Sequence, residues 1–127
     1  MKDYTIEELK ELLTKVYEKI PPLAIRSAAK ELQIKRLHQS AIDCLRWCVA
    51  IQIVGLPITI NLMRELIPKS PSALRHRLHI LGDKRLLTLI RKGDRCRWVV
   101  HPSLLKRLPL EEVRKFVEEI LLCESEY

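Results

Sequence analysis

The stretch that decides the fold is ITINLMRELIPKSPSALRHRLHILGDKRLLTLIRKGDRCRWVVH, which runs from Ile58 to His101. Its first part predicts a short helix that Thr59 caps and Pro68 closes. A threonine hydroxyl satisfies free backbone amides, and proline cannot continue a helix. Between these two signals, apolar residues recur at helical spacing: Leu62, Met63, Leu66 and Ile67.

The next helix begins at the best boundary signal in the chain. Ser70 is a helix-capping residue, and Pro71 follows it at the first helical position, where its missing amide costs nothing. We expect this helix to run to about Leu81 and to end at Gly82. Its buried side is defined by three leucines: Leu74, Leu78 and Leu81.

Beyond this helix the helical period disappears. Residues 87–90 and 96–100 are rich in β-forming residues and flank a turn that contains Gly93 and Asp94, which predicts an antiparallel hairpin. Alternate residues of a strand share a face. The second run therefore divides into two sets, with Cys96, Trp98 and Val100 on one side and Arg95 and Arg97 on the other.

Four further helices are expected, over residues 6–20, 24–32, 39–54 and from about 109 onward. The first begins with a capping box formed by Thr5 and Glu8 and stops at Pro21. The third is apolar almost all round, which predicts the central, buried helix of the domain. The fold class is therefore mainly α with a small β-hairpin. At 127 residues we expect one domain, 1–127, made of residues 1–37, 38–107 and 108–127.

Positive charge is concentrated in the middle of the chain. Residues 1–34 carry six Lys/Arg and six Asp/Glu, residues 35–108 carry 15 and four, and residues 109–127 carry two and six. A basic segment between neutral and acidic ends is typical of proteins that contact the phosphate backbone of nucleic acids. A solvated surface is the alternative explanation for such a charge run.

The order helix, helix, serine-capped helix and hairpin resembles the winged helix-turn-helix family. Together with the leading and trailing helices, it makes the chain similar to dimeric MarR-type transcriptional regulators. The matching residues lie within 39–107: Ile58 to Ile67, Ser70 to Leu74, Leu78, Leu81, and Asp94 to Trp98. The resemblance implies a winged helix-turn-helix flanked by N- and C-terminal dimerisation helices. The chain departs from the pattern in its short wing, where Cys96 and Trp98 replace more polar residues.

The polar side of the serine-capped helix lies opposite its leucines, given a step of about 100° per residue. In the major groove, Arg75 would read guanine bidentately, and Ser72 and His76 would contact bases or phosphates. The expected DNA-binding residues of this recognition helix are Ser70, Ser72, Arg75, His76, Arg77 and His79. Those of the wing and its flanks are Lys69, Lys84, Arg85, Arg91, Lys92, Arg95 and Arg97. Ordinary surface charge is the alternative for these cations.

The terminal helices are amphipathic, and we expect their apolar stripes to form a twofold interface, as the resemblance also implies. The expected interface residues are Ile6, Leu9, Leu13, Val113, Val117, Ile120 and Leu121. A homodimer of this kind would place two recognition helices about 34–36 Å apart on a near-palindromic site. In the alternative arrangement, both helices fold back onto their own subunit.

Catalytic and cofactor motifs are not recognised, so an enzyme is not expected. The glycines are too dispersed for a nucleotide-binding loop, and HExxH and GxSxG are absent. Cys44 and Cys48 have a spacing that could hold two metal ligands, but nothing nearby completes a tetrahedral set, so we interpret them as buried core residues. Cys96 and Cys123 are the candidates for a redox-sensitive thiol. No metal or cofactor is expected, and a small-molecule effector is possible but not indicated.

The expected function is that of a homodimeric, sequence-specific regulator of transcription that binds double-stranded DNA. No apolar stretch is long enough to span a membrane, and the first residues lack an apolar signal segment, which predicts a cytoplasmic, nucleoid-associated protein. Two alternatives remain open. One is a low-specificity nucleoid or accessory DNA-binding protein, and the other is a winged-helix module that binds protein.

Overall fold

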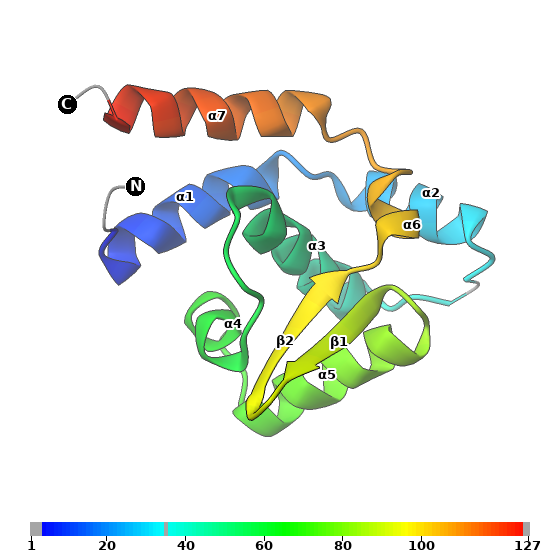
Figure 1. Cartoon of the computed structure of the whole chain (residues 1–127). Helices are drawn as coiled ribbons and strands as arrows, with labels where there is room; N and C mark the ends of the chain where they lie inside the picture. Colours follow the sequence, from blue (N-terminus) through cyan, green and yellow to red (C-terminus); the bar gives the residue numbers. More distant parts are fainter. Residues whose placement is uncertain (1–3, 35, 126–127) are drawn as a thin grey trace.

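The computed structural model describes residues 4–34 and 36–125, and residues 123–125 by their backbone alone. Within these residues the chain is mainly helical, with one two-stranded sheet (Figure 1). The elements are α1 (Ile6–Glu18), α2 (Pro22–Glu31), α3 (Gln39–Val54), α4 (Ile60–Leu66), α5 (Pro71–Asp83), β1 (Leu87–Lys92), β2 (Arg95–Val100), α6 (Pro102–Leu105) and α7 (Glu111–Ser125). The predicted fold class, mainly α with a small hairpin, is confirmed at this level.

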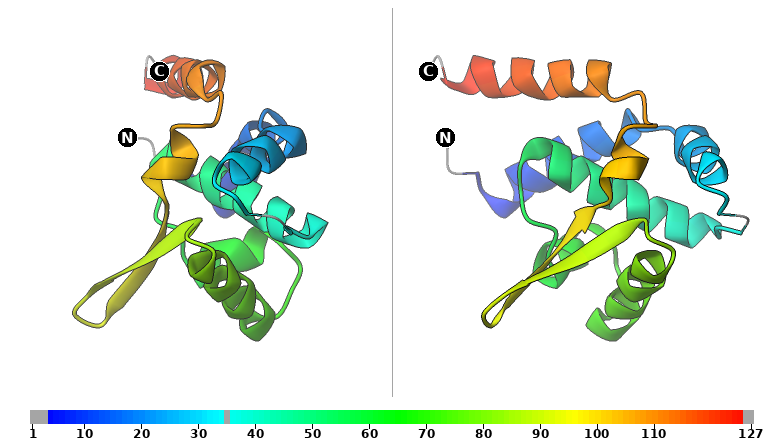
Figure 2. Two further views of the ribbon diagram at one scale, coloured as in Figure 1. Left: turned by 90° about the vertical axis from the view of Figure 1, so that its right-hand side faces the viewer. Right: turned by 45° about the vertical axis from the view of Figure 1, so that its right-hand side comes forward.

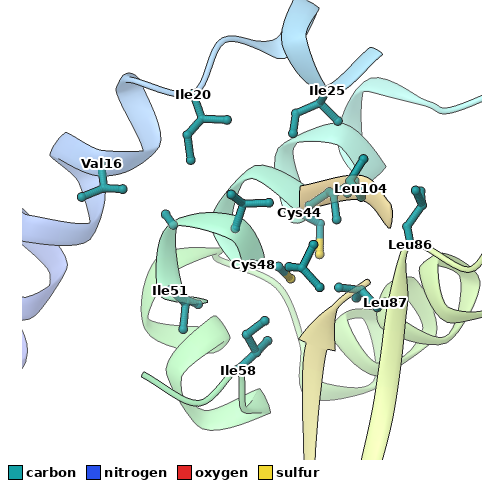
Figure 3. Close-up of a cluster of buried hydrophobic side chains, with 14 of the residues drawn as sticks. Val16, Ile20, Ile25, Cys44, Cys48, Ile51, Ile58, Leu86, Leu87 and Leu104 are labelled. Carbon is teal, nitrogen blue, oxygen red and sulfur yellow. The ribbon is translucent and has the colours of Figure 1, made fainter. Parts of the chain in front are cut away.

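Helix α3 lies in the middle of the molecule, with the other helices and the hairpin around it (Figure 1). A helix that is covered on all sides must be apolar nearly all round, and nine of the 16 residues of α3 are buried. Gly55 ends it with a φ of 94°, a left-handed conformation that glycine adopts without steric cost. The core around it combines side chains from several elements (Figure 3), among them Val16, Ile25, Leu87 and Leu104. The prediction of a central, buried helix over residues 39–54 is confirmed.

Arg46 of α3 is a charged residue within this core, with 9 % of its surface exposed. Its Nε donates to the carbonyl oxygen of Ile20 at 2.6 Å, and its Nη2 donates to that of Tyr17 at 3.0 Å. These carbonyls lie at the end of α1 and in the turn after it, where a helix leaves acceptors without intrahelical donors. The guanidinium also lies over the Tyr17 ring, which stacks on Trp47 with 4.0 Å between ring centroids. Arg46 therefore fixes the end of α1 on α3.

Strands β1 and β2 form an antiparallel hairpin in which Leu87 lies opposite Val100 and Lys92 lies opposite Arg95. Two residues connect the strands. The first of them, Gly93, has a φ of 61°, a conformation that hairpin turns require and that favours glycine. The hairpin predicted from the sequence is confirmed, and its strands extend to the turn.

The base of the hairpin is held from two sides. On one side, the backbone N–H of Trp98 donates to the carbonyl of Ile58 at 3.2 Å, so the segment before α4 forms a bridge with β2. On the other, the amide oxygen of Gln52 accepts from the backbone N–H of Val100 at 2.6 Å. Gln52 stands in an otherwise apolar run, and this hydrogen bond is the reason that a polar residue is accommodated there.

The prediction that Gly82 ends the serine-capped helix is wrong, because α5 continues to Asp83. A Cβ at position 82 would lie 3.0 Å from Cζ3 of the Trp98 ring. Glycine at this position allows the indole to approach the helix closely without a shift of the ring. The chain leaves the helix through Arg85, whose φ is 62°.

Most helix boundaries follow the predicted caps. The side-chain oxygens of Thr5, Thr59 and Ser70 each accept a backbone hydrogen bond from the first turn of the helix that follows. Three details differ from the sequence expectations. Helix α2 begins at Pro22 and not at residue 24. Helix α7 begins at Glu111, and the short helix α6, which His101 caps through its Nδ1, was not predicted.

Replacement of Arg46 by methionine removes both hydrogen bonds but retains the apolar length of the side chain. The carbonyl of Ile20 then loses its donor in a buried position, and we expect the free energy of unfolding to fall by about 2–4 kcal/mol. Urea denaturation followed by far-UV circular dichroism measures this change. Arg64→Met makes the same substitution at an exposed position of α4 and should stay within about 0.5 kcal/mol of the parent protein. Equal losses in the two variants would contradict the role given to Arg46.

Candidate nucleic-acid interface

Helix α5 presents the polar face that the sequence predicts. The hydroxyl oxygen of Ser70 accepts from the backbone N–H of Ala73 at 3.2 Å and so caps the helix. The three leucines of the buried stripe are fully covered. Ser72, Arg75 and His76 are consequently exposed on the N-terminal half of the helix. Short polar and guanidinium side chains at this end of a helix are those that reach base edges in a major groove.

Two predicted residues of α5 lie at the margins of this face. Arg77 is half-buried and lies close enough to α3 for its charge to affect the thiol of Cys44. His79 is exposed, but its ring meets the edge of Trp98 with 5.0 Å between centroids and an interplanar angle of 83°. The central part of the exposed face is therefore formed by the first two turns of the helix.

The register of the hairpin divides its four cations between two faces. Residues directly opposite each other share a face of a sheet. Lys92 lies opposite Arg95, and Arg97 lies opposite Ile90, so these three cations are on the face that points away from the core. Arg91 lies opposite Cys96 on the other face, toward the tip from Trp98. The sequence prediction that Arg95 and Arg97 share a face is confirmed, and Lys92 joins them.

The pairing of Lys92 with Arg95 carries an energetic cost. Like charges directly opposite each other on neighbouring strands destabilise a sheet. Residues 69–97 contain nine Lys/Arg and only two Asp/Glu, and among the described residues none of the nine forms an ion pair. Local rules of stability are broken in this way mainly at functional sites. The outward face of the hairpin therefore carries positive charge that no acidic side chain of the described residues neutralises.

The hairpin and α5 lie at the same end of the molecule, as both views of Figure 2 show, and α7 lies at the opposite end. The flanking cations are also at this end, because they belong to the segments that enter and leave α5. Lys69 and Arg85 are exposed, and Lys84 is half-buried. The structure thus brings the predicted residues of the recognition helix, wing and flanks into one region.

The predicted interface between subunits is corrected in part. Leu13, Val113 and Val117 are buried in the core of their own chain, with at most 4 % of their surface exposed, so they cannot form a contact with a second copy. For these residues the fold-back alternative holds. The other four predicted residues keep accessible surface: Ile6 is 45 % exposed, and Leu9, Ile120 and Leu121 are half-buried.

The contacts that position the hairpin were missed in the sequence. Trp98, Gln52 and Ile58 hold its base against α5, α3 and the segment before α4. A signal existed for one of them, because a glutamine inside an apolar helix needs a buried hydrogen-bond partner. No sequence signal distinguishes Arg91 from the other hairpin cations until the register is known.

Two kinds of feature are absent from the described residues. No helix is both long and apolar enough to cross a membrane. Within the same residues, no three His, Cys, Asp or Glu side chains gather as a metal site would require. Cys96, a candidate redox thiol, is exposed on the hairpin, and the side chain of Cys123 lies outside the described residues.

Arg95→Thr removes the like-charge pair with Lys92 and introduces a β-forming residue. We expect the free energy of unfolding to rise by a few tenths of a kcal/mol at low salt, and the gain to shrink as salt screens the repulsion. Thermal denaturation at two ionic strengths measures both effects. Arg97→Thr is the matched control, because its direct partner is the uncharged Ile90, and its gain should be smaller. A stability loss in Arg95→Thr would show that the charges do not repel.

Comparisons with known proteins leave the chain without an assigned relative. No protein-family model matches it, and no curated protein and no solved structure matches it either.

Proposed function

We propose that this protein binds double-stranded DNA as a sequence-specific transcriptional regulator of winged-helix type. The observation that carries the proposal is that the exposed face of α5 and the cationic hairpin lie together at one end of the molecule, in a segment with nine Lys/Arg and two Asp/Glu. Phosphate contacts dominate the affinity of proteins for DNA, and a surface of this charge supplies them.

In the proposed complex, α5 enters the major groove with its N-terminal half. Arg75 donates to the O6 and N7 atoms of a guanine, and Ser72 and His76 contact neighbouring bases or phosphates. The outward cations of the hairpin, with Lys92 and Arg95 nearest the tip, contact the backbone or the adjacent minor groove, where arginine favours a narrow, electronegative groove. Base contacts would give specificity, and hairpin contacts would position the protein.

The arrangement around α5 supports a winged-helix reading. The bridge between Ile58 and Trp98 joins the segment before α4 to the hairpin, next to the helix pair α4 and α5. Helices α1 and α7 stand outside this unit, as the leading and trailing helices of a MarR-type regulator do. We accordingly propose that the hairpin acts as a wing and α5 as the recognition helix.

Selection from a random duplex library, followed by a salt titration on the enriched sequence, tests this proposal. An enriched inverted repeat supports a dimeric, sequence-specific regulator. Tight, salt-sensitive binding without enrichment would replace it with a low-specificity accessory protein of the nucleoid. Absence of binding at low salt would overturn DNA binding and favour the protein-interaction module.

Arg75→Ala should cost about 1–3 kcal/mol of binding free energy on the enriched site and relax the base preference at one position. Fluorescence anisotropy on the enriched duplex and on single-base variants measures both effects. Arg114→Ala removes the same charge from α7, at the opposite end of the molecule, and should leave affinity nearly unchanged. A loss in Arg75→Ala that is uniform over all sequences would make Arg75 a phosphate contact.

For the homodimer, we propose an interface that uses the accessible apolar residues of the terminal helices: Ile6, Leu9, Ile120 and Leu121. The start of α1 and the end of α7 lie on the same side of the molecule (Figure 1), so one partner surface can cover both. Such an interface on a twofold axis would present two α5 helices to one duplex.

Ile6→Glu and Val117→Glu should have different effects. Ile6 is 45 % exposed and Val117 is 4 % exposed. A charge at position 6 should therefore halve the mass in light scattering while the thermal midpoint stays close to that of the parent. A charge at position 117 should lower the midpoint strongly, because it is buried without a partner. An unchanged mass in Ile6→Glu would remove Ile6 from any subunit contact.

A further inference from the structure

A groove runs along one side of α2, apart from the proposed DNA interface. Its volume is about 650 Å³, which is within the range of small-molecule sites. Helix α2 lies away from the tip of the hairpin in both views of Figure 2. The residues that line the groove come from α2 and from the segment that leads into α3: Arg26, Ala29, Lys30, Gln33, Ile34 and Leu37. None of them is a predicted DNA-binding residue.

Both walls of the groove are fixed by hydrogen bonds. Where α2 ends, the backbone N–H of Ile34 donates to the carbonyl of Ala29 at 3.0 Å, which folds Ile34 back against the helix. On the opposite wall, the guanidinium of Arg26 donates to the carbonyl of Leu37 at 3.4 Å and to the side-chain oxygen of Gln39 at 3.0 Å. The groove is therefore formed before a ligand arrives, and binding requires little ordering of the protein.

The groove combines an apolar floor with a cationic rim. Ala29 is buried, and Ile34 and Leu37 are half-buried and pack against the hydrophobic core. Arg26 and Lys30 are exposed. A ligand that lies on the floor therefore has two positive charges beside it.

The charge of this rim is not neutralised by the described residues. Residues 21–42 contain four Lys/Arg and a single acidic residue, Glu31. The carboxylate of Glu31 lies 3.5 Å from Nε of Arg107, which is not a lining residue of the groove. In the described part of the chain, neither Arg26 nor Lys30 forms an ion pair. The two hydrogen bonds of Arg26 use two of the five N–H donors of a guanidinium, so donors remain for a ligand.

We propose that this groove binds a small carboxylate with an apolar body, such as a medium-chain alkyl carboxylate. Charge complementarity selects the anion, because guanidinium and ammonium groups form charge-assisted hydrogen bonds with carboxylates. The floor selects the apolar body, whose burial removes hydrocarbon surface from water. A neutral amphiphile lacks the first contribution, and a compact anion lacks the second.

Titration of the full chain with octanoate, acetate and 1-octanol, followed by the amide resonances of the protein in NMR spectra, tests the site without DNA. Octanoate should bind saturably, with one molecule per chain, and should shift the amides of Ile34 and Leu37. Its affinity should exceed that of acetate and of 1-octanol by about tenfold or more. Octanoate shifts that are confined to other parts of the chain would overturn the groove as the site. An equal affinity for 1-octanol or for acetate would overturn the proposed ligand class.

Lys30→Glu should weaken octanoate binding about tenfold, because it replaces an attractive charge at the rim by a repulsive one. Lys15→Glu is the matched control, since Lys15 is also an exposed lysine in the last turn of its helix. Its affinity should stay within about twofold of the parent protein. Equal affinities in the two variants would overturn the part given to Lys30. The ligand series in the parent protein decides the site even if a variant fails to fold.

Discussion

The structure depends on how the central helix accommodates polar groups on a surface that is otherwise buried. At Arg46, the guanidinium makes two hydrogen bonds to the end of α1 and lies on the Tyr17 ring. Six residues later, Gln52 binds the backbone of β2. Each of these contacts connects α3 to an element that is distant in sequence, and each leaves a buried polar group unpaired if it is lost. Helix α3 is thus both the centre of the core and the part that orients α1 and the hairpin.

The two ends of the molecule differ in how their charged groups are accommodated. Around α1 and α3, apolar contacts dominate the core, and the buried guanidinium of Arg46 is hydrogen-bonded to the end of α1. At the end formed by α5 and the hairpin, the cations form no ion pair with other described residues, and Lys92 faces Arg95 across the strands. In the free protein, repulsion between these like charges lowers the stability of the hairpin. The repulsion would be relieved by an anionic partner, so part of the binding free energy of that partner would come from strain already present in the free protein.

Much of the fold could be predicted from local signals, because caps and prolines act within a few residues. Ser70 and Pro71 begin α5, and the alternation of residues 95–100 determines the faces of β2. The remaining features depend on neighbours that are distant in sequence. Gly82 has the sequence pattern of a helix end but serves the approach of Trp98. The apolar stripes of α1 and α7 indicated that these helices pack against other surfaces. They did not show which stripe residues would be buried within their own chain.

The ring of Trp98 fills the space between α5 and the base of the hairpin, where only glycine at position 82 leaves room for it. The ring therefore sets the separation between α5 and the base of the hairpin. The distance between the helix that would enter one groove and the hairpin that would follow the backbone is therefore established before any partner arrives. A preorganised surface loses less conformational entropy on binding than a mobile one. If the partner is a DNA duplex, as proposed, the fixed spacing would also select for its curvature, because a duplex whose grooves do not match it would have to bend.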